Sequence, residues 1–327
     1  MLTFPNKKDT MPKFTRRDLL LTGGVTTLTS PLTEIMSGSV YAQEKPTKKP
    51  FRSCLNFGTL IGFNLSFEEE IDVAAKAGFR SIEPWPSKIE QFLEKGGKLS
   101  DARKRINDHG LIVENLCTFY PWMVDDDSMR TNGIEQMKNN MDWAVQLGTD
   151  RIAATSIGAT EVRLDDFRVL GDRYRTLLEI GDTIGVWPLL EIWGRVKTLN
   201  SLADCLAVAA WAGHPQAMLL LDVFHLYRGG SPIEGLSLVN GKKIHTFHVH
   251  DYPADPPRDK IEDNHRVYCG DGVAPLTTIF RTLRSIGFEG SLSFEVFNQT
   301  YWATNDPLLV VKTGLEKLES VISASEL

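Results

Sequence analysis

Residues 217–225 read AMLLLDVFH, a continuously apolar run that ends in an aspartate and a histidine. Such a run indicates a β-strand covered on both faces, as in a parallel sheet flanked by helices. Similar runs recur at 53–60, 81–85, 111–118, 151–156, 186–193, 244–251 and 290–297. The segments between them place apolar residues three and four apart, which indicates amphipathic helices.

Alternation of strand and helix predicts an α/β fold, and its regularity predicts which one. Eight strand–helix units in about 270 residues favour a single (β/α)8 TIM barrel over an open doubly wound sheet. A dinucleotide-binding sheet would need GxGxxG after the first strand, and residues 58–62, GTLIG, do not supply it. Glycines close helical segments just before the next strand, at the usual C-cap position. They are Gly78, Gly110, Gly148, Gly185, Gly213 and Gly287.

Composition narrows the class of protein. The chain has 327 residues, a formal net charge of −6, 42% hydrophobic and 24% charged residues, as in a soluble globular protein. A net negative charge argues against nucleic acid as a partner, because non-specific binding to nucleic acid depends on a basic surface. The four cysteines are widely spaced without a CxxC pair, so neither a zinc ribbon nor a disulfide framework is expected.

The first 42 residues have the pattern of an export signal. Lysines precede Arg16-Arg17, a weakly apolar stretch follows, and Val40-Tyr41-Ala42 resembles a cleavage site. The adjacent arginines resemble the twin-arginine type, so we expect an exported, periplasmic protein. The apolar stretch is too short to span a bilayer, and no stable membrane span is expected in the mature form. A disordered basic tail is the alternative. The expected organisation is signal 1–42, linker 43–50, barrel 51–322 and tail 323–327.

Acidic and histidine residues stand at the carboxyl ends of the predicted strands, where side chains converge in a TIM barrel. They are Glu83, Glu191, Asp222, His225, His248, His250 and Glu295. Buried carboxylates and imidazoles are costly unless they are paired or bind a metal. Two of the glutamates, the aspartate and one histidine would form an oxygen-rich set suited to one divalent ion, Mn²⁺, Mg²⁺ or Co²⁺, with Zn²⁺ also possible. Taken singly, Asp222 could be a helix cap and His248 a core histidine.

Several motifs resemble the xylose-isomerase-like TIM barrels of sugar isomerases and epimerases, over roughly residues 52–320. They are LEIW (190–193), LDVFH (221–225), HVH (248–250), GDG (270–272) and SFE (293–295). The resemblance implies metal ligation by Glu191, Asp222, His250 and Glu295, with His225 and Arg266 contacting the substrate. Two positions depart from the family pattern. Cys269 replaces the usual proline before the glycine turn, and Lys197 replaces a second acidic substrate contact.

His248 and His250 are alternative candidates for the histidine ligand. Alternation along a strand puts both on the same face. His250 lies nearer the strand end and matches the family ligand, so it is the predicted choice.

Isomerisation and epimerisation both require removal of a proton from the carbon next to a carbonyl. Glu191 and Glu295, from different strands, are predicted to be the acid–base pair. A bound metal would stabilise the resulting enediolate. His225, Arg266 and Glu83 are predicted to bind substrate oxygens, and Trp85, Phe119, Trp122 and Trp193 to stack on the sugar or wall the barrel mouth. The predicted enzyme is a metal-dependent sugar isomerase or epimerase, with a homo-oligomer possible.

Three other functions are alternatives to a sugar isomerase or epimerase. A 3-keto-glycoside lyase could use the same site for β-elimination. A metal-dependent DNA-repair nuclease shares the barrel, and Asp263-Asn264-His265 resembles one of its elements, but Glu83-Pro84-Trp85 and Cys117-Thr118-Phe119 lack its extra histidines. A periplasmic sugar-binding barrel would keep the site without turnover, because a fold does not determine a function.

Overall fold

The computed structural model describes residues 51–326. The predicted signal peptide (1–42) and linker (43–50) lie outside the described residues, as does Leu327 of the predicted tail. Among residues 51–326, no helix is long and apolar enough to cross a membrane.

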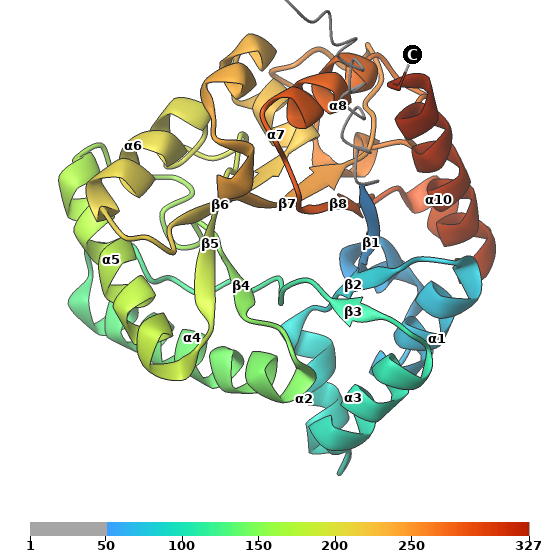
Figure 1. Ribbon diagram of the computed structural model, residues 1–327, viewed down its shortest axis with the longest axis horizontal. Coiled ribbons are helices and arrows are strands. Elements are labelled where there is room, and N and C mark those ends of the chain that lie inside the picture. The colour runs from blue at the N-terminus through green and yellow to red at the C-terminus, as the bar shows by residue number, and fades with distance from the viewer. Residues whose placement is uncertain (1–50, 327) are drawn as a thin grey trace, which may run out of the picture. The chain divides into compact units, whose positions relative to one another are not determined.

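Eight parallel strands form one curled sheet with helices outside it, which confirms the predicted α/β barrel (Figure 1). The strands are β1 (Arg52–Asn56), β2 (Ser81–Glu83), β3 (Ile112–Val113), β4 (Arg151–Ala154), β5 (Trp187–Glu191), β6 (Met218–Asp222), β7 (Ile244–Val249) and β8 (Ser291–Phe294). Their order is β3-β2-β1-β8-β7-β6-β5-β4. Between β3 and β4 the barrel closes through an isolated parallel bridge, Leu116 to Ile152.

Helices cover the outside of the strands. The α-helices are α1 (Phe67–Ala77), α2 (Pro86–Glu94), α3 (Leu99–Asp108), α4 (Asp127–Leu147), α5 (Phe167–Ile184), α6 (Leu202–Ala212), α7 (Val223–Arg228), α8 (Leu276–Ser285), α9 (Gln299–Trp302) and α10 (Pro307–Ala324). Short 3-10 helices are η1 (Phe57–Phe63), η2 (Ile233–Leu238), η3 (Gly241–Lys243) and η4 (Asp263–His265).

The glycines predicted to end helices all adopt positive φ, between 60° and 98°. Gly78, Gly148, Gly185 and Gly213 are the C-cap residues themselves. A side chain at positive φ is strained, so glycine lets each chain segment leave its helix and enter the next strand.

The inside of the barrel is divided by polarity. Ala153, Leu189 and Leu220 form a small apolar cluster on the β4–β6 side. Asn56, Glu83, Asn115, Thr246, His248 and Ser293 are polar and buried. Buried polar groups need hydrogen-bond partners, so these residues limit the positions that polar side chains can take at the carboxyl ends of the strands.

Candidate metal centre and active site

Neighbouring strands bring the predicted ligands together. Asp222 ends β6 and is in register with His248 of β7, which is in turn in register with Ser293 of β8. Glu295 follows two residues after Ser293, on the same side by alternation. Glu191 ends β5. Strand register thus places Asp222 and Glu295 on the strands either side of His248, with Glu191 at the end of the strand beyond Asp222.

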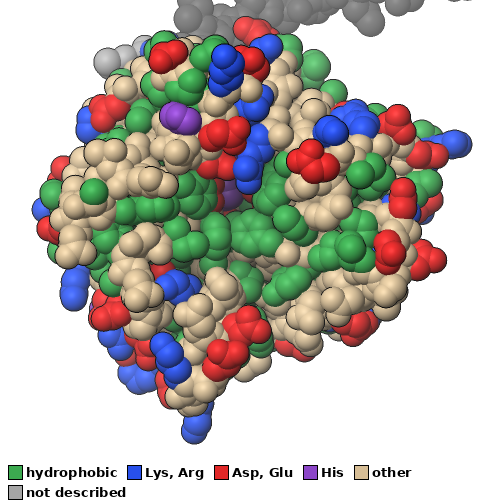
Figure 2. Space-filling view, turned by 180° about the vertical axis from the view of Figure 1, so that it is seen from behind, with side chains coloured by type: hydrophobic (Ala, Val, Ile, Leu, Met, Phe, Trp, Pro, Cys, Tyr) green, Lys and Arg blue, Asp and Glu red, His purple; other side chains and the backbone are tan. Residues whose placement is uncertain are grey.

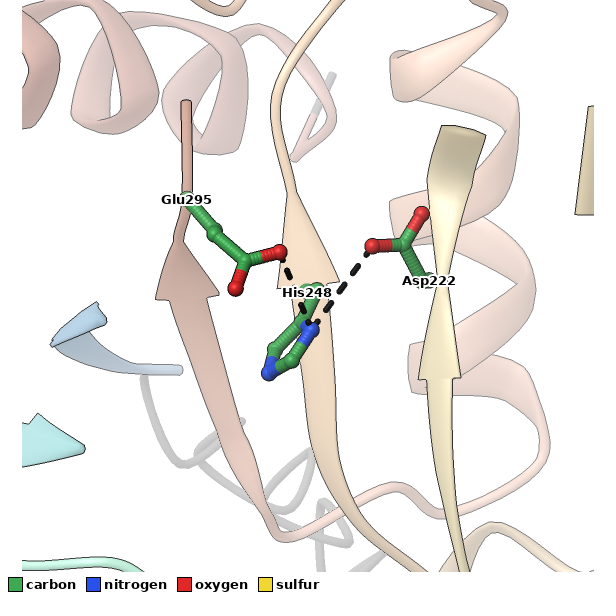
Figure 3. Close-up of side chains that lie close together, drawn as sticks. All are labelled: Asp222, His248 and Glu295. Atoms are coloured by element: carbon green, nitrogen blue, oxygen red, sulfur yellow. Dashed lines mark ion pairs between the residues drawn. The ribbon is translucent and has the colours of Figure 1, made fainter. Parts of the chain in front are cut away.

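Asp222, His248 and Glu295 form a tight buried group (Figure 3). One potential ligand atom from each lies within 4.8 Å of the others. His248 Nδ1 is 3.6 Å from Asp222 Oδ2 and 3.5 Å from Glu295 Oε2. The three side chains come from β6, β7 and the end of β8, so the group spans adjacent strands.

Glu83 fixes the orientation of His248. Its two carboxylate oxygens each lie 3.0 Å from His248 Nε2. Glu83 also accepts hydrogen bonds from Asn56 Nδ2 at 2.9 Å and Ser293 Oγ at 2.7 Å. With Nε2 directed at Glu83, Nδ1 faces Asp222 and Glu295. Metal-binding histidines are commonly oriented by a carboxylate in this way. Glu83 was predicted to contact the substrate. In the structure it is fully buried, and its carboxylate oxygens contact His248, Asn56 and Ser293.

His250 lies outside this group. It is fully buried, and its Nε2 is 3.6 Å from Asp222 Oδ1, the oxygen that also caps α7 by accepting from the His225 amide. The geometry therefore gathers His248 with the two acids, although the sequence pattern favoured His250. Burial, with the charge of Arg266, lowers the pKa of His250 well below its ordinary value.

Arg266 reaches the same carboxylates from the loop after β7. Its Nη1 donates to Glu295 Oε2 at 2.6 Å and to Asp222 Oδ2 at 3.3 Å. Its Nη2 donates to Asp263 Oδ1 at 2.6 Å and lies 3.4 Å from His225 Nε2. The guanidinium is buried, so it offsets part of the negative charge of the site.

Glu191 is poised differently from Glu295. Its Oε1 accepts a hydrogen bond from Trp193 Nε1 at 3.0 Å, and its buried Oε2 has no hydrogen-bond partner. Burial raises the pKa of Glu191 to about 8, with a further contribution from Glu295. Burial also raises the pKa of Glu295, against the opposing charges of His248 and Arg266.

Both glutamates face a cavity of about 320 Å³ at the carboxyl ends of the strands. Its lining consists of Ile61, Trp85, Cys117, Phe119, Glu191, Trp193, Arg195, His225, Asp263, Arg266, Glu295 and Phe297. His225 and Arg266, the residues predicted to contact the substrate, are among the lining residues. Burial lowers the pKa of His225 to about 4, which leaves its imidazole neutral near pH 7.

Trp122, which the sequence predicted to stack on the sugar or wall the barrel mouth, lies elsewhere. It is fully buried, donates from Nε1 to the Thr155 carbonyl at 2.7 Å and packs on Tyr174, so it does not line the cavity. Trp193, Trp85 and Phe119 do line it.

The lining residues that the sequence did not predict are Ile61, Cys117, Arg195, Asp263 and Phe297. Phe297 follows Glu295 by two residues, and strand alternation could have placed it on the same side. Ile61 and Arg195 lie in segments after β1 and β5, and no sequence periodicity predicts their direction.

The donor set fits a divalent cation. Glu191 Oε2, His248 Nδ1, His225 Nδ1 and both ring nitrogens of His250 are buried without hydrogen-bond partners. Unpartnered buried polar atoms are costly, and a cation beside these carboxylates would satisfy those of Glu191 and His248. Two or three carboxylates with one imidazole suit Mn²⁺, Mg²⁺, Co²⁺ or Zn²⁺.

Comparisons with known proteins agree with this architecture. A family model described as "Xylose isomerase-like TIM barrel" matches residues 71–321. Inosose isomerase of Bacillus velezensis is 26% identical over 275 residues, covering 83% of this chain and 96% of the relative. The 3-dehydroshikimate dehydratase of Pseudomonas aeruginosa is 28% identical over 255 residues, covering 74% of this chain and 38% of the relative. A crystal structure of IOLI protein with a binding zinc atom shares the fold, with a TM-score of 0.78 and 23% identity over 84% of this chain and 99% of that chain.

Proposed function

Because the chain belongs to the xylose isomerase-like TIM barrel family, we propose that it is a divalent-metal-dependent isomerase or epimerase of a sugar or sugar-derived hydroxy-carbonyl compound. The observation that carries this proposal is the position of Glu191 and Glu295. They come from different strands and face one cavity; Glu295 belongs to the buried group with Asp222 and His248, and Glu191 interacts electrostatically with His248 and Glu295. The similarity to inosose isomerase supports the same reaction class.

The proposed metal ligands are Glu191, Asp222, His248 and Glu295. His248 is preferred to His250 because its Nδ1 faces two of the acids while Glu83 holds Nε2. When bound, a divalent cation would act as a Lewis acid that stabilises negative charge on the substrate's carbonyl oxygen. The zinc of the related IOLI structure makes Zn²⁺ one of the metals to test.

Glu191 and Glu295 would move the proton. A carboxylate removes the proton from the carbon beside the carbonyl, and a carboxylic acid returns one to the neighbouring carbon or to the opposite face. Trp193 and Arg266 restrict the two carboxylates to fixed positions by hydrogen bonds of 3.0 Å and 2.6 Å. Neutral His225 and cationic Arg266 would bind substrate oxygens on which charge develops.

The test is proton exchange catalysed by the full-length protein. We expect solvent deuterium to appear at the carbon next to the carbonyl of a ketose or keto-inositol in a panel followed by NMR. Chelator should abolish the exchange and Mn²⁺ or Zn²⁺ should restore it. Glu191→Gln and Glu295→Gln should each slow it by about 100-fold or more, the usual contribution of a positioned acid or base.

Glu289→Gln is the matched control, because Glu289 lies in the loop before β8 and does not line the cavity. It should exchange deuterium as the unchanged protein does. Exchange that survives chelator, or that survives both active-site substitutions, would contradict the proposal. A metal-dependent ligand complex without any exchange across the panel would indicate the sugar-binding barrel instead.

A second candidate is β-elimination at the same site. Similarity to a 3-dehydroshikimate dehydratase favours it, because dehydration next to a ketone begins with the same proton removal. A 3-keto-glycoside would then release its aglycone after enolate formation. Chromatographic detection of free aglycone, without an isomerised sugar, would distinguish elimination from isomerisation.

A further inference from the structure

The cavity is lined by two groups of residues of opposite character, which meet where Arg195 lies over Trp193 and Arg266 over Phe297, 5.9 Å and 5.2 Å from the ring centroids. One carries the charged and polar groups Glu191, His225, Asp263, Arg266 and Glu295. The other, which we call the aromatic wall, consists of Ile61, Trp85, Phe119, Trp193 and Phe297. Figure 2 shows hydrophobic side chains gathered beside a hollow in which a histidine and charged side chains are visible.

The rings of the aromatic wall form a continuous, curved surface. Trp85 lies 4.8 Å from Phe119 and 6.1 Å from Phe297, measured between ring centroids, and Phe119 lies 6.0 Å from Trp193. The ring planes are tilted by 40–59° to one another, so they partly surround an occupant rather than offer one flat platform. Ile61, 44% exposed, extends the wall to the rim.

The aromatic wall offers no free hydrogen-bonding group. Trp85 Nε1 donates to Asn56 Oδ1 at 2.8 Å, and Trp193 Nε1 donates to Glu191 Oε1 at 3.0 Å. The phenylalanines and Ile61 have no polar atoms. A hydroxyl pressed against this wall would lose its water without gaining a partner, which disfavours a fully hydroxylated occupant.

The charges at the rim do not call for an anionic occupant either. Arg195 lines the cavity, but its Nε lies 3.0 Å from Asp263 Oδ2. Asp263 is shared with Arg266, whose other contacts are Glu295 and Asp222. Both guanidinium groups are therefore already paired with carboxylates.

We propose that the aromatic wall is a subsite for an uncharged, ring-bearing substituent of the substrate. The substrate class is then a hydroxy-carbonyl compound that carries an apolar substituent, such as an aryl glycoside derivative, rather than a free sugar or a sugar phosphate. The placement of its hydroxy-carbonyl end among Glu191 and Glu295 rests on the proposed function. The subsite itself rests on the aromatic wall.

The test compares phenyl β-D-glucopyranoside with methyl β-D-glucopyranoside by calorimetry on the Mn²⁺-loaded full-length protein. The two probes differ only in the apolar substituent. We expect the phenyl glycoside to bind at least about tenfold more tightly, because burial of a ring removes its apolar surface from water. Phe119→Ala and Phe297→Ala should reduce this preference severalfold and leave the affinity for the methyl glycoside nearly unchanged.

Trp211→Ala is the matched control, because Trp211 is a 52% exposed aromatic residue of α6 outside the cavity lining. It should leave the preference unchanged. Equal affinities, or no binding of the phenyl glycoside, would overturn the subsite. The comparison in the unsubstituted protein needs no variant, so misfolding of an alanine variant does not remove the test.

Repeating the titrations without metal, alongside the deuterium-exchange assay, distinguishes failure of this inference from failure of the proposed function. A phenyl preference that persists while no metal-dependent deuterium exchange occurs would support the subsite and refute the proposed function. Metal-dependent exchange with equal affinities for the two glycosides would refute the subsite alone.

Discussion

His248 and His250 are two residues apart, yet their nitrogens have different surroundings. β7 ends at Val249, so only His248 belongs to the strand. Glu83 lies 3.0 Å from one nitrogen of His248 and two carboxylates lie near the other, while both nitrogens of His250 lack hydrogen-bond partners. Sequence alternation placed both on one face. It could not show that the acids at the ends of the neighbouring strands meet at His248 rather than at His250.

This difference predicts that the same substitution will change metal affinity at position 248 but not at position 250. His248→Asn should weaken Mn²⁺ or Zn²⁺ binding by at least about 100-fold, because loss of a ligand should exceed the 10–100-fold cost of losing an outer partner. His250→Asn should leave metal affinity nearly unchanged and is the matched control. The measurement is competition with a chelating dye, with melting curves to confirm folding. The reverse pattern would identify His250 as the ligand.

Other site residues show which signals a sequence carries. Glu191, Asp222 and Glu295 were predicted because acids at strand ends must converge in a barrel. Glu83 was placed at the site, but its contact with His248 could not be predicted because the two residues are 165 positions apart in the sequence. Trp122 was misplaced because the segment after β3 turns its indole toward Thr155 and Tyr174.

At the scale of elements, every predicted strand is present, but all eight end earlier than the apolar runs suggested. β6 stops at Asp222, whose side chain caps α7, although the run extends to His225. β1 stops at Asn56, whose side chain caps η1. The residues beyond these points are apolar because they are buried in η1 and α7, so hydrophobicity alone could not mark the strand ends.

α1 contains a buried acid that predicts how stability depends on pH. Glu70 is fully buried, neither of its oxygens has a hydrogen-bond partner, and Lys88 Nζ lies 3.9 Å away. Burial raises the pKa of Glu70 from 4.5 to about 8, although Lys88 opposes the shift. The folded chain thus holds this proton more tightly than the unfolded chain. Between these two pH values, the free energy of unfolding should fall as pH rises, by at most about 1.4 kcal/mol per pH unit from this group.

Glu70→Gln should remove this contribution, because glutamine resembles the protonated acid and carries no charge at any pH. We expect the variant to be more stable than the unchanged protein at pH 8 and similar to it at pH 5. Urea unfolding at both pH values measures the difference. Glu68→Gln, in the first turn of the same helix, is the control and should not alter the pH dependence. A Glu70→Gln variant that gains no stability between pH 5 and pH 8 would show that Glu70 ionises normally.

At the scale of the whole molecule, the parallel barrel separates the candidate site from the start of the described chain. The site lies at the carboxyl ends of β5 to β8. Arg52, the first residue of β1, lies at the amino end of a strand parallel to them.

We propose that residues 1–42 direct export and that the mature chain begins at Gln43. Replacement of both Arg16 and Arg17 by lysine should retain the protein in the cytoplasm, because a twin-arginine signal depends on the arginines and not on charge alone. The reciprocal replacement of Lys7 and Lys8 by arginine is the control and should allow export. Cell fractionation and N-terminal sequencing measure both outcomes. The chain beginning at Gln43 should bind metal as tightly as the full-length chain, since all the proposed ligands belong to the barrel strands or follow them directly. Export of the lysine variant would refute the signal, and a change in metal affinity on removal of residues 1–42 would show that this segment reaches the site.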